Sequence, residues 1–216
     1  MKIGIIGAGN IGTGLGKRLA ADGHDIVVGF ARTPDKVAAA AQAIGGSARA
    51  GPPDEAARHG EGVILATPWA VTLDAVRSVA DSLAGTIVWD ATNPLKPDMS
   101  GLEVGTTSSG GELVAESAPA AMVVKAIPPF AEVLHSPGSI ADVSGGRPSV
   151  FVCGDDAAAR ATVLTLVDSI GADGVDGGPL TMARYTEPAG MLLVQLAYAQ
   201  GLGPRIGSAL LRDGAA

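Results

Sequence analysis

Short apolar runs alternate with helical patterns along the first half of the chain. Runs of four or five mostly apolar residues predict strands, which lie at residues 2–6, 25–29, 47–50, 63–66 and 86–89. Between the first two runs, Ile11, Leu15 and Leu19 recur every four residues and predict a helix with one apolar stripe against a sheet. Further helices are expected from residue 34 onward, at residues 54–58 and at residues 71–83.

Two helix boundaries carry local signals. Gly23 follows Asp22 at the end of the first helix, and glycine readily adopts the left-handed conformation that closes many helices. Thr33 precedes Pro34 at the start of the next helix. We expect Thr33 to cap that helix and Pro34 to occupy its first position.

The second half of the chain continues the alternation less regularly. Helices are expected at residues 111–116 and 157–170 and from about Leu180 onward, with strands at residues 122–126 and 149–153. Strands that alternate with helices are typical of a parallel sheet with right-handed crossovers. We therefore predict an α/β protein with a Rossmann-type, doubly wound, mostly parallel sheet. Residues 1–178 would form the Rossmann domain, and residues 179–216 a small C-terminal helical extension packed on it.

A glycine-rich segment, Gly7-Ala8-Gly9-Asn10-Ile11-Gly12, joins the first strand to the first helix. In this context Gly7 permits a tight turn, Gly9 lets the backbone approach a pyrophosphate, and Gly12 allows the helix to pack closely on the strand. Asn10 and Ile11 begin the helix, whose unpaired N–H groups and positive dipole end attract phosphate. The segment therefore predicts a dinucleotide site to which all five of these residues contribute.

The end of the second strand bears on the choice between NAD and NADP. An NAD enzyme usually has an acid about 20 residues past the glycines to bind the ribose hydroxyls, and no acid ends this strand. Arg32 stands there instead, with Thr33 and Lys36 beside it. A guanidinium can bind a 2′-phosphate with paired hydrogen bonds, and an ammonium adds a point charge. Asp35 is an acid close to this position, and we interpret it as a first-turn acid of the following helix. We predict that residues 1–178 bind NADP(H) through these three side chains.

Five later segments add to the glycine-rich start: Thr67-Pro68-Trp69, Asn93-Pro94-Leu95, Lys125-Ala126-Ile127-Pro128, Cys153-Gly154-Asp155-Asp156 and Asp176-Gly177-Gly178-Pro179-Leu180. Together, and in this order over almost the whole chain, they resemble the NADP-dependent reductases of the deazaflavin coenzyme F420. That family is related to the cytoplasmic, dinucleotide-binding domains of membrane ferric reductases.

The resemblance implies further cofactor contacts. It places Thr67, Pro68 and Trp69 after a strand, near the nicotinamide half of the cofactor. It assigns a second group to the same crevice beyond the carboxyl ends of the strands, namely Asn93, Pro94, Leu95 and Ala126.

The chain departs from the family pattern at Lys125. Reductases of this family often have histidine at this place, and the wider family often has lysine followed by Ala-Phe-Asn, whereas this chain has Lys125-Ala126-Ile127-Pro128-Pro129. A lysine at the end of a strand could donate a hydrogen bond or a proton if burial lowered its pKa, which makes Lys125 the candidate catalytic residue. It could equally pair with a carboxylate or with the carboxamide of the coenzyme.

The resemblance implies hydride transfer between NADPH and F420. Both molecules carry their own reactive carbon, so the protein need only stack, align and shield them. No Ser-Tyr-Lys or His-Asp set stands out, and the three histidines are expected to be structural or exposed. Two alternatives stay open. One is an NADPH-dependent reductase of a small imine or carbonyl, a flavin or a chelated metal, with Lys125 placing the acceptor. The other is a sensor that binds NADP(H) without turnover.

Composition and charge exclude several classes of protein. A net charge of −7 leaves no basic stripe for nucleic acid. The only cysteine, Cys153, excludes an internal disulfide and a multi-cysteine metal site, and we expect it to be buried in a strand. No apolar run approaches the roughly 20 residues needed to cross a bilayer, so we expect a cytoplasmic protein that does not engage a membrane.

The final helix carries one more expectation. Residues 191–197 are apolar on nearly every side, which indicates burial against more than one neighbour. Burial within the chain would explain this pattern, and so would burial against a second copy. Because two-fold dimers are the commonest assemblies, we expect a homodimer.

Overall fold

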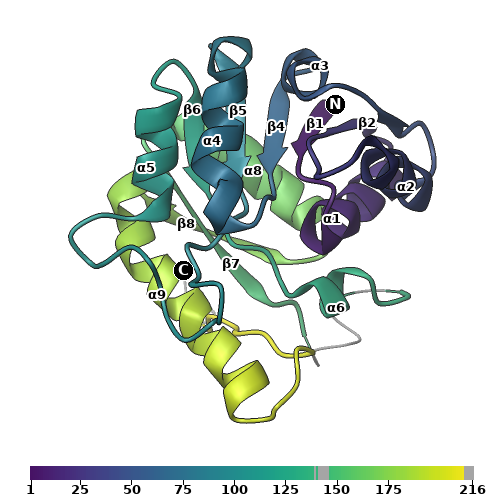
Figure 1. Cartoon of the computed structure of the whole chain (residues 1–216). Helices are drawn as coiled ribbons and strands as arrows, with labels where there is room; N and C mark the ends of the chain where they lie inside the picture. The colour runs from purple at the N-terminus through teal and green to yellow at the C-terminus, as the bar shows by residue number, and fades with distance from the viewer. Residues whose placement is uncertain (139, 141–145, 212–216) are drawn as a thin grey trace.

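The computed structural model describes residues 1–138, 140 and 146–211, and these residues form one eight-stranded sheet (Figure 1). The strands lie in the order β3-β2-β1-β4-β5-β6-β7-β8. Their bounds are β1 Lys2–Ile6, β2 Asp25–Gly29, β3 Arg49–Ala50, β4 Gly62–Leu65, β5 Ile87–Asp90, β6 Met122–Lys125, β7 Ser149–Gly154 and β8 Asp173–Gly178. Every neighbouring pair is parallel except β6 and β7. This confirms the doubly wound, mostly parallel α/β fold.

Helices cover both faces of the sheet. Their bounds are α1 Asn10–Ala21, α2 Pro34–Ile44, α3 Pro53–Arg58, α4 Trp69–Val79, α5 Gly110–Ser117, α6 Ala131–Leu134, α8 Ala157–Ser169 and α9 Ala183–Val194, with short turns η1 Ala80–Leu83, η2 Leu180–Met182 and η3 Gln195–Ala199. One apolar core joins α1, α2 and α8 to the sheet, and a second joins α3, α4 and α5 to its other face. The central strands β1, β2 and β4 are mostly apolar on both sides because both faces are covered.

The predicted elements were found with small shifts at their ends, and two elements had not been predicted. The edge strand β8 is rich in glycine and aspartate, which strands disfavour, and only its pairing with β7 holds it extended. The short helix α6 falls in a stretch for which no helix or strand was predicted. Pro34 does begin α2, but the Thr33 hydroxyl makes no cap hydrogen bond, which corrects the predicted cap.

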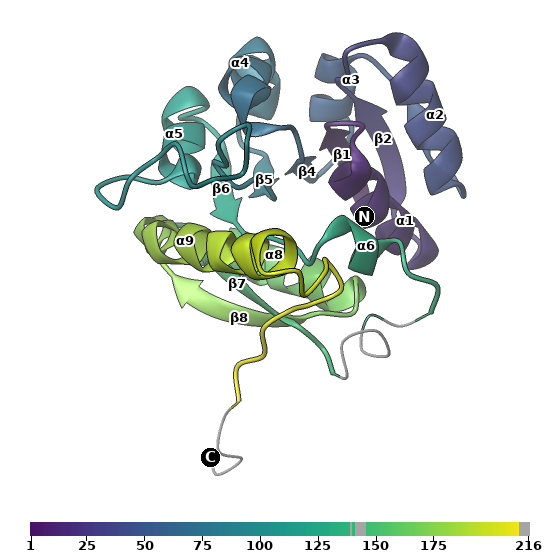
Figure 2. The same ribbon diagram turned by 60° about the horizontal axis from the view of Figure 1, so that its bottom comes forward.

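The C-terminal part of the chain lies across the carboxyl ends of the strands. Figure 2 brings this edge forward and shows α6 and α9 in front of it, with β7 and β8 behind α9. After η3 the chain runs back to β7, where Ser149 N–H donates to Ser208 O over 2.7 Å and Leu210 N–H donates to Ser149 Oγ over 2.8 Å.

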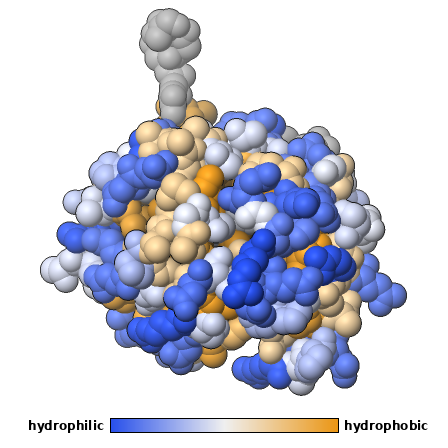
Figure 3. Space-filling view, turned by 90° about the horizontal axis from the view of Figure 1, so that it is seen from above, coloured by the Kyte–Doolittle hydropathy of each residue, from blue (hydrophilic) through white to orange (hydrophobic). Residues whose placement is uncertain are grey.

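The surface is mixed in character. The face shown in Figure 3 carries hydrophilic side chains around smaller apolar areas. Within the described ranges, no helix is both long enough and apolar enough to cross a bilayer.

Candidate functional site

A cavity of about 700 Å³ opens beyond the carboxyl ends of the strands. One wall comes from the turns that follow β1, β4 and β5. The opposite wall comes from α9, from the chain that follows β6, and from the C-terminal segment near residue 207. In doubly wound sheets this edge is where ligands bind, near the point at which the order of strands reverses. Here that point lies between β1 and β4.

The glycine segment forms one end of the cavity. Gly7 has φ +128°, and a side chain there would overlap the carbonyl of Ala66. A side chain at Gly12 would overlap the carbonyl of Gly7, so α1 packs directly on the turn. An added side chain at Gly9 would meet nothing within 4 Å. Gly9 therefore presents bare backbone to the cavity at the amino terminus of α1, where helical N–H groups have no intrahelical acceptor.

Three basic or polar residues follow β2. Arg32, Thr33 and Lys36 are all exposed, and Arg32 lines the cavity whereas Thr33 and Lys36 do not. Within the described chain, the Arg32 guanidinium makes no hydrogen bond or ion pair. It is therefore available to an anionic ligand at this end of the cavity.

The turns after β4 and β5 form the middle of the cavity. Thr67, Pro68 and Trp69 line it, and the Thr67 hydroxyl is held by the Thr72 hydroxyl over 2.9 Å. Asn93 lines it as well, whereas Pro94 is buried behind the turn. The cavity therefore brings together, of the predicted cofactor contacts, Gly9, Asn10, Ile11, Arg32, Thr67, Pro68, Trp69, Asn93 and Leu95. The remaining predicted cofactor contacts lie outside the lining of the cavity, namely Gly7, Gly12, Thr33, Lys36, Pro94 and Ala126.

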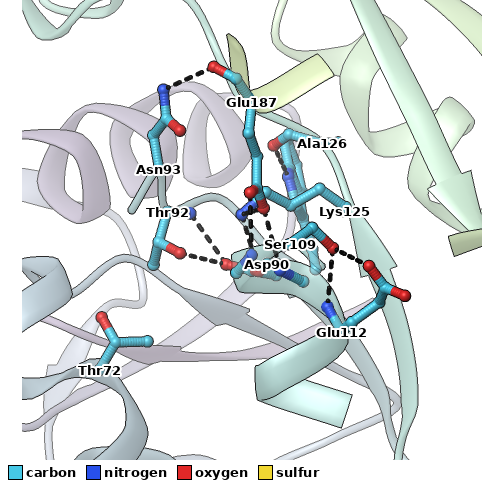
Figure 4. Close-up of polar contacts among 12 residues, drawn as sticks. Thr72, Asp90, Thr92, Asn93, Ser109, Glu112, Lys125, Ala126 and Glu187 are labelled. Carbon is cyan, nitrogen blue, oxygen red and sulfur yellow. Dashed lines mark hydrogen bonds and ion pairs between the residues drawn. The ribbon is translucent and has the colours of Figure 1, made fainter. Parts of the chain in front are cut away.

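Lys125, the candidate catalytic residue, lies outside the cavity lining and is fully buried. Its Nζ lies 2.9 Å from Asp90 Oδ2 and 3.0 Å from Glu187 Oε1, and both carboxylates are buried too (Figure 4). Burial alone would lower the pKa of Lys125, but the two carboxylates outweigh it and raise the pKa above its ordinary value. A role as proton donor would need a lowered pKa, and this condition is not met. The ammonium of Lys125 stays charged because it neutralises two acids. Of the roles considered above, Lys125 therefore has the pairing with a carboxylate.

Glu187 is the residue of this cluster that the sequence did not reveal. It lies on α9, and its Oε2 and Oε1 accept hydrogen bonds from Gly110 N–H over 2.8 Å and Gly111 N–H over 2.9 Å. These two N–H groups begin α5, so a carboxylate from α9 satisfies the exposed end of another helix. The sequence offers little signal for it, because α9 also carries Arg184 and Thr186 and the burial of Glu187 follows only from the fold.

Asp90 organises the turn after β5. Its Oδ1 accepts hydrogen bonds from Thr92 N–H over 3.0 Å and from the Thr92 hydroxyl over 2.7 Å. Its other oxygen faces Lys125. The cluster of Asp90, Lys125 and Glu187, which we call the buried charge cluster, thus joins the β5 turn to α9.

The wall formed by α9, the chain after β6 and the C-terminal segment is largely apolar. Phe130 and Tyr198 meet there edge to face, with ring centroids 6.0 Å apart and planes at 87°. Burial and the nearby Glu132 raise the pKa of Tyr198, so its phenol is neutral at pH 7. Leu193 of α9 and Ile206 of the C-terminal segment complete this wall.

Arg18 fixes the chain after β6 against α1. Its guanidinium donates to the carbonyls of Leu134 over 3.0 Å, Ser136 over 2.8 Å and Gly138 over 2.6 Å. The ring nitrogen Nε2 of His135 lies 2.9 Å from Asn10 O, next to the glycine segment. These contacts hold the Phe130 side of the cavity at a set distance from its dinucleotide end.

Cys153 ends up as predicted, buried in β7. Burial and the charge of Asp176 raise the pKa of its thiol to about 11. A thiol in this state is a poor nucleophile at neutral pH, which leaves it a packing role.

Comparisons with known proteins agree with this geometry. The family model described as NADP oxidoreductase, coenzyme F420-dependent, matches residues 2–94. The crystal structure of a proposed F420-dependent NADP reductase from Arthrobacter sp. FB24 is 31% identical, with a TM-score of 0.86 over 98% of this chain and 100% of that one. A hypothetical protein, SMa0349 from Sinorhizobium meliloti, is 28% identical with a TM-score of 0.74, over 99% and 96% of the two chains.

A third relative matches this chain over only part of its own length. The metalloreductase STEAP3 of Rattus norvegicus is 31% identical over 186 residues, which cover 86% of this chain and 36% of the rat protein. The chain thus spans about a third of the length of that relative. The matches to reductases identify an NADP-dependent oxidoreductase and give no support to a sensor without turnover.

Proposed function

Since the chain belongs to the family of F420-dependent NADP oxidoreductases, we propose that it transfers hydride between NADPH and the deazaflavin coenzyme F420. The observation that carries this proposal is a single continuous cavity with two unlike walls. One wall has bare backbone at Gly9 and the unpartnered guanidinium of Arg32, and the opposite wall includes Phe130 and Tyr198. Such a cavity suits a phosphate-rich dinucleotide along one wall and a flat ring against the other.

The dinucleotide end fits NADP(H) in three respects. Gly9 leaves room for a pyrophosphate at the amino terminus of α1, which carries no acid in its first turn. Arg32 stands where a 2′-phosphate would extend from the adenosine ribose. Thr67 and Trp69 border the middle, where the nicotinamide ring would follow. NADPH supplies a hydride when bound, and these residues bind and orient it.

The apolar wall explains why no side chain with obvious acid–base chemistry is needed. Apolar side chains there exclude water and hold a planar ring against the nicotinamide. The neutral phenol of Tyr198 is one polar group that could lie beside such a ring. Alignment of two rings that carry their own reactive carbons accounts for most of the catalysis required.

A second candidate is NADPH-dependent reduction of a flavin or a chelated metal. The similarity to a metalloreductase over 86% of this chain favours it. It uses the same dinucleotide end and differs only in what lies against the apolar wall. For small imines and carbonyls the solved imine reductases, at 13% to 17% identity, show a common fold alone.

The test is stopped-flow absorbance of the purified protein with NADPH and oxidised F420. Rapid bleaching of the deazaflavin with NADPH, and much slower bleaching with NADH, supports the proposal and the role of Arg32. Parallel reactions with free flavin and with a ferric chelate test the second candidate. Tight NADPH binding with no bleaching of F420 would remove F420 as the acceptor.

A further inference from the structure

The side chain of Asn93 has one partnered end and one end without a partner. Its Nδ2 donates to the backbone carbonyl of Glu187 over 3.3 Å. Its Oδ1 is buried and has no hydrogen-bond partner among the described residues. Asn93 lines the cavity in the turn after β5, beside Thr92. A buried acceptor therefore stands in the wall of the proposed cofactor site.

The surroundings fix which end of the amide is unpartnered. A backbone carbonyl can only accept, so the NH₂ end of Asn93 must face Glu187. On the same helix, a side chain at Gly190 would come within 2.9 Å of Asn93 Nδ2, so the glycine at this position lets the amide lie directly against α9. Figure 4 shows the Asn93 nitrogen directed at the Glu187 carbonyl.

The buried charge cluster fixes both parts of the structure that position the Asn93 amide, namely the turn of α9 and the turn after β5. Lys125 ties the Glu187 carboxylate in place and thereby fixes the turn of α9 that offers the carbonyl. Lys125 also ties Asp90, whose other oxygen shapes the turn that carries Asn93. The position of Asn93 Oδ1 is thus set from two sides before any ligand arrives.

A buried acceptor without a partner lowers stability unless a ligand supplies a donor. With the pyrophosphate at the glycine segment and the adenosine beside Arg32, the nicotinamide lies toward β4 and β5. The nicotinamide ring carries one hydrogen-bond donor, its carboxamide NH₂. We propose that Asn93 Oδ1 accepts a hydrogen bond from this NH₂ group and so sets the orientation of the ring in the cavity. This inference rests on the dinucleotide placement given above.

The test compares NADP⁺ with its 3-acetylpyridine analogue, in which a methyl group replaces the NH₂ group. Binding of each is measured by calorimetry to the wild-type protein and to Asn93→Leu. The wild type should bind NADP⁺ about 10-fold or more tightly than the analogue, the ratio expected for one buried acceptor left unsatisfied. In Asn93→Leu the ratio should shrink to about 2-fold or less, with thermal melting to confirm folding.

Val71→Ala is the control, because Val71 lies on α4, is 42% exposed and does not line the cavity. It should keep the full wild-type ratio. Equal binding of the two dinucleotides by the wild type would overturn the inference without any variant, and so would a folded Asn93→Leu that keeps the preference. Neither measurement needs a hydride acceptor, so failure of F420 reduction and failure of this inference are separate results.

Discussion

Replacing Lys125 by methionine should destabilise the fold severely, because it leaves two buried carboxylates without their cation. Lys125 is 0% exposed, Asp90 is 0% exposed and Glu187 is 2% exposed, so water cannot compensate. Removing one partner of a buried ion pair costs about 3–5 kcal/mol. In a chain of this size each kcal/mol lowers Tm by roughly 2–4 °C, which gives a loss of about 6–20 °C.

Two further measurements separate the charge effect from a loss of packing. The double variant Lys125→Met with Glu187→Gln should melt higher than Lys125→Met alone, because one unpaired negative charge is gone and a Gln oxygen still accepts from Gly110 or Gly111. The deficit of Lys125→Met relative to the wild type should also shrink as pH falls, since protonation removes the uncompensated charge of its carboxylates.

The wild-type protein has the opposite pH dependence at the alkaline end. The pKa of Lys125 is raised above its ordinary value of 10.5, so the stability that it contributes is fully present below that value. It is lost only as pH rises through the raised pKa. The assay is thermal melting by circular dichroism from pH 5 to pH 11. A Lys125→Met variant that melts within about 2 °C of the wild type at pH 7 would refute the reasoning.

Three further predictions follow from single features. Arg32→Ala should weaken NADPH binding by about 10-fold to 100-fold and leave NADH binding nearly unchanged, because only the 2′-phosphate loses its partner. Titration of each dinucleotide, followed by fluorescence, measures both affinities. Equal losses of affinity for NADPH and NADH would contradict the prediction. The homodimer predicted from the final helix should give about twice the 21.3 kDa chain mass in light scattering. Leu192→Arg should release monomers, because Leu192 and Tyr185 are 59% and 70% exposed on α9. A wild-type monomer at micromolar concentration would end this prediction. Cys153, with a pKa of about 11 and no exposure, should stay unreactive toward a thiol reagent at pH 8 until the protein is denatured, and fast labelling of the native protein would disagree.

The sequence predicted what depends on local pattern and missed what depends on distant partners. The apolar runs that became β1, β2 and β4 were evident because strands covered on both faces are apolar throughout. In β8, with its glycines and aspartates, no such run exists, and its extended form comes from β7 alone. The available guanidinium of Arg32 followed from a local pattern at the end of a strand, but nothing near Glu187 in the sequence marks it as the partner of Lys125, 62 positions away.

Glu187 also bears on how the two predicted parts of the chain relate. The segment after residue 178 was expected to pack on the Rossmann domain as a small addition. Glu187 belongs to this segment, yet it neutralises Lys125 of β6 and completes the amino terminus of α5, both of which lie in the main part. Without it, a buried ammonium would keep one carboxylate instead of two, and two helical N–H groups would lose their acceptor. The same helix supplies the carbonyl that orients Asn93 and the side chain of Leu193 in the apolar wall of the cavity. The C-terminal helix is therefore anchored to the main part of the chain through buried groups, and the charge that anchors it also shapes the proposed nicotinamide site.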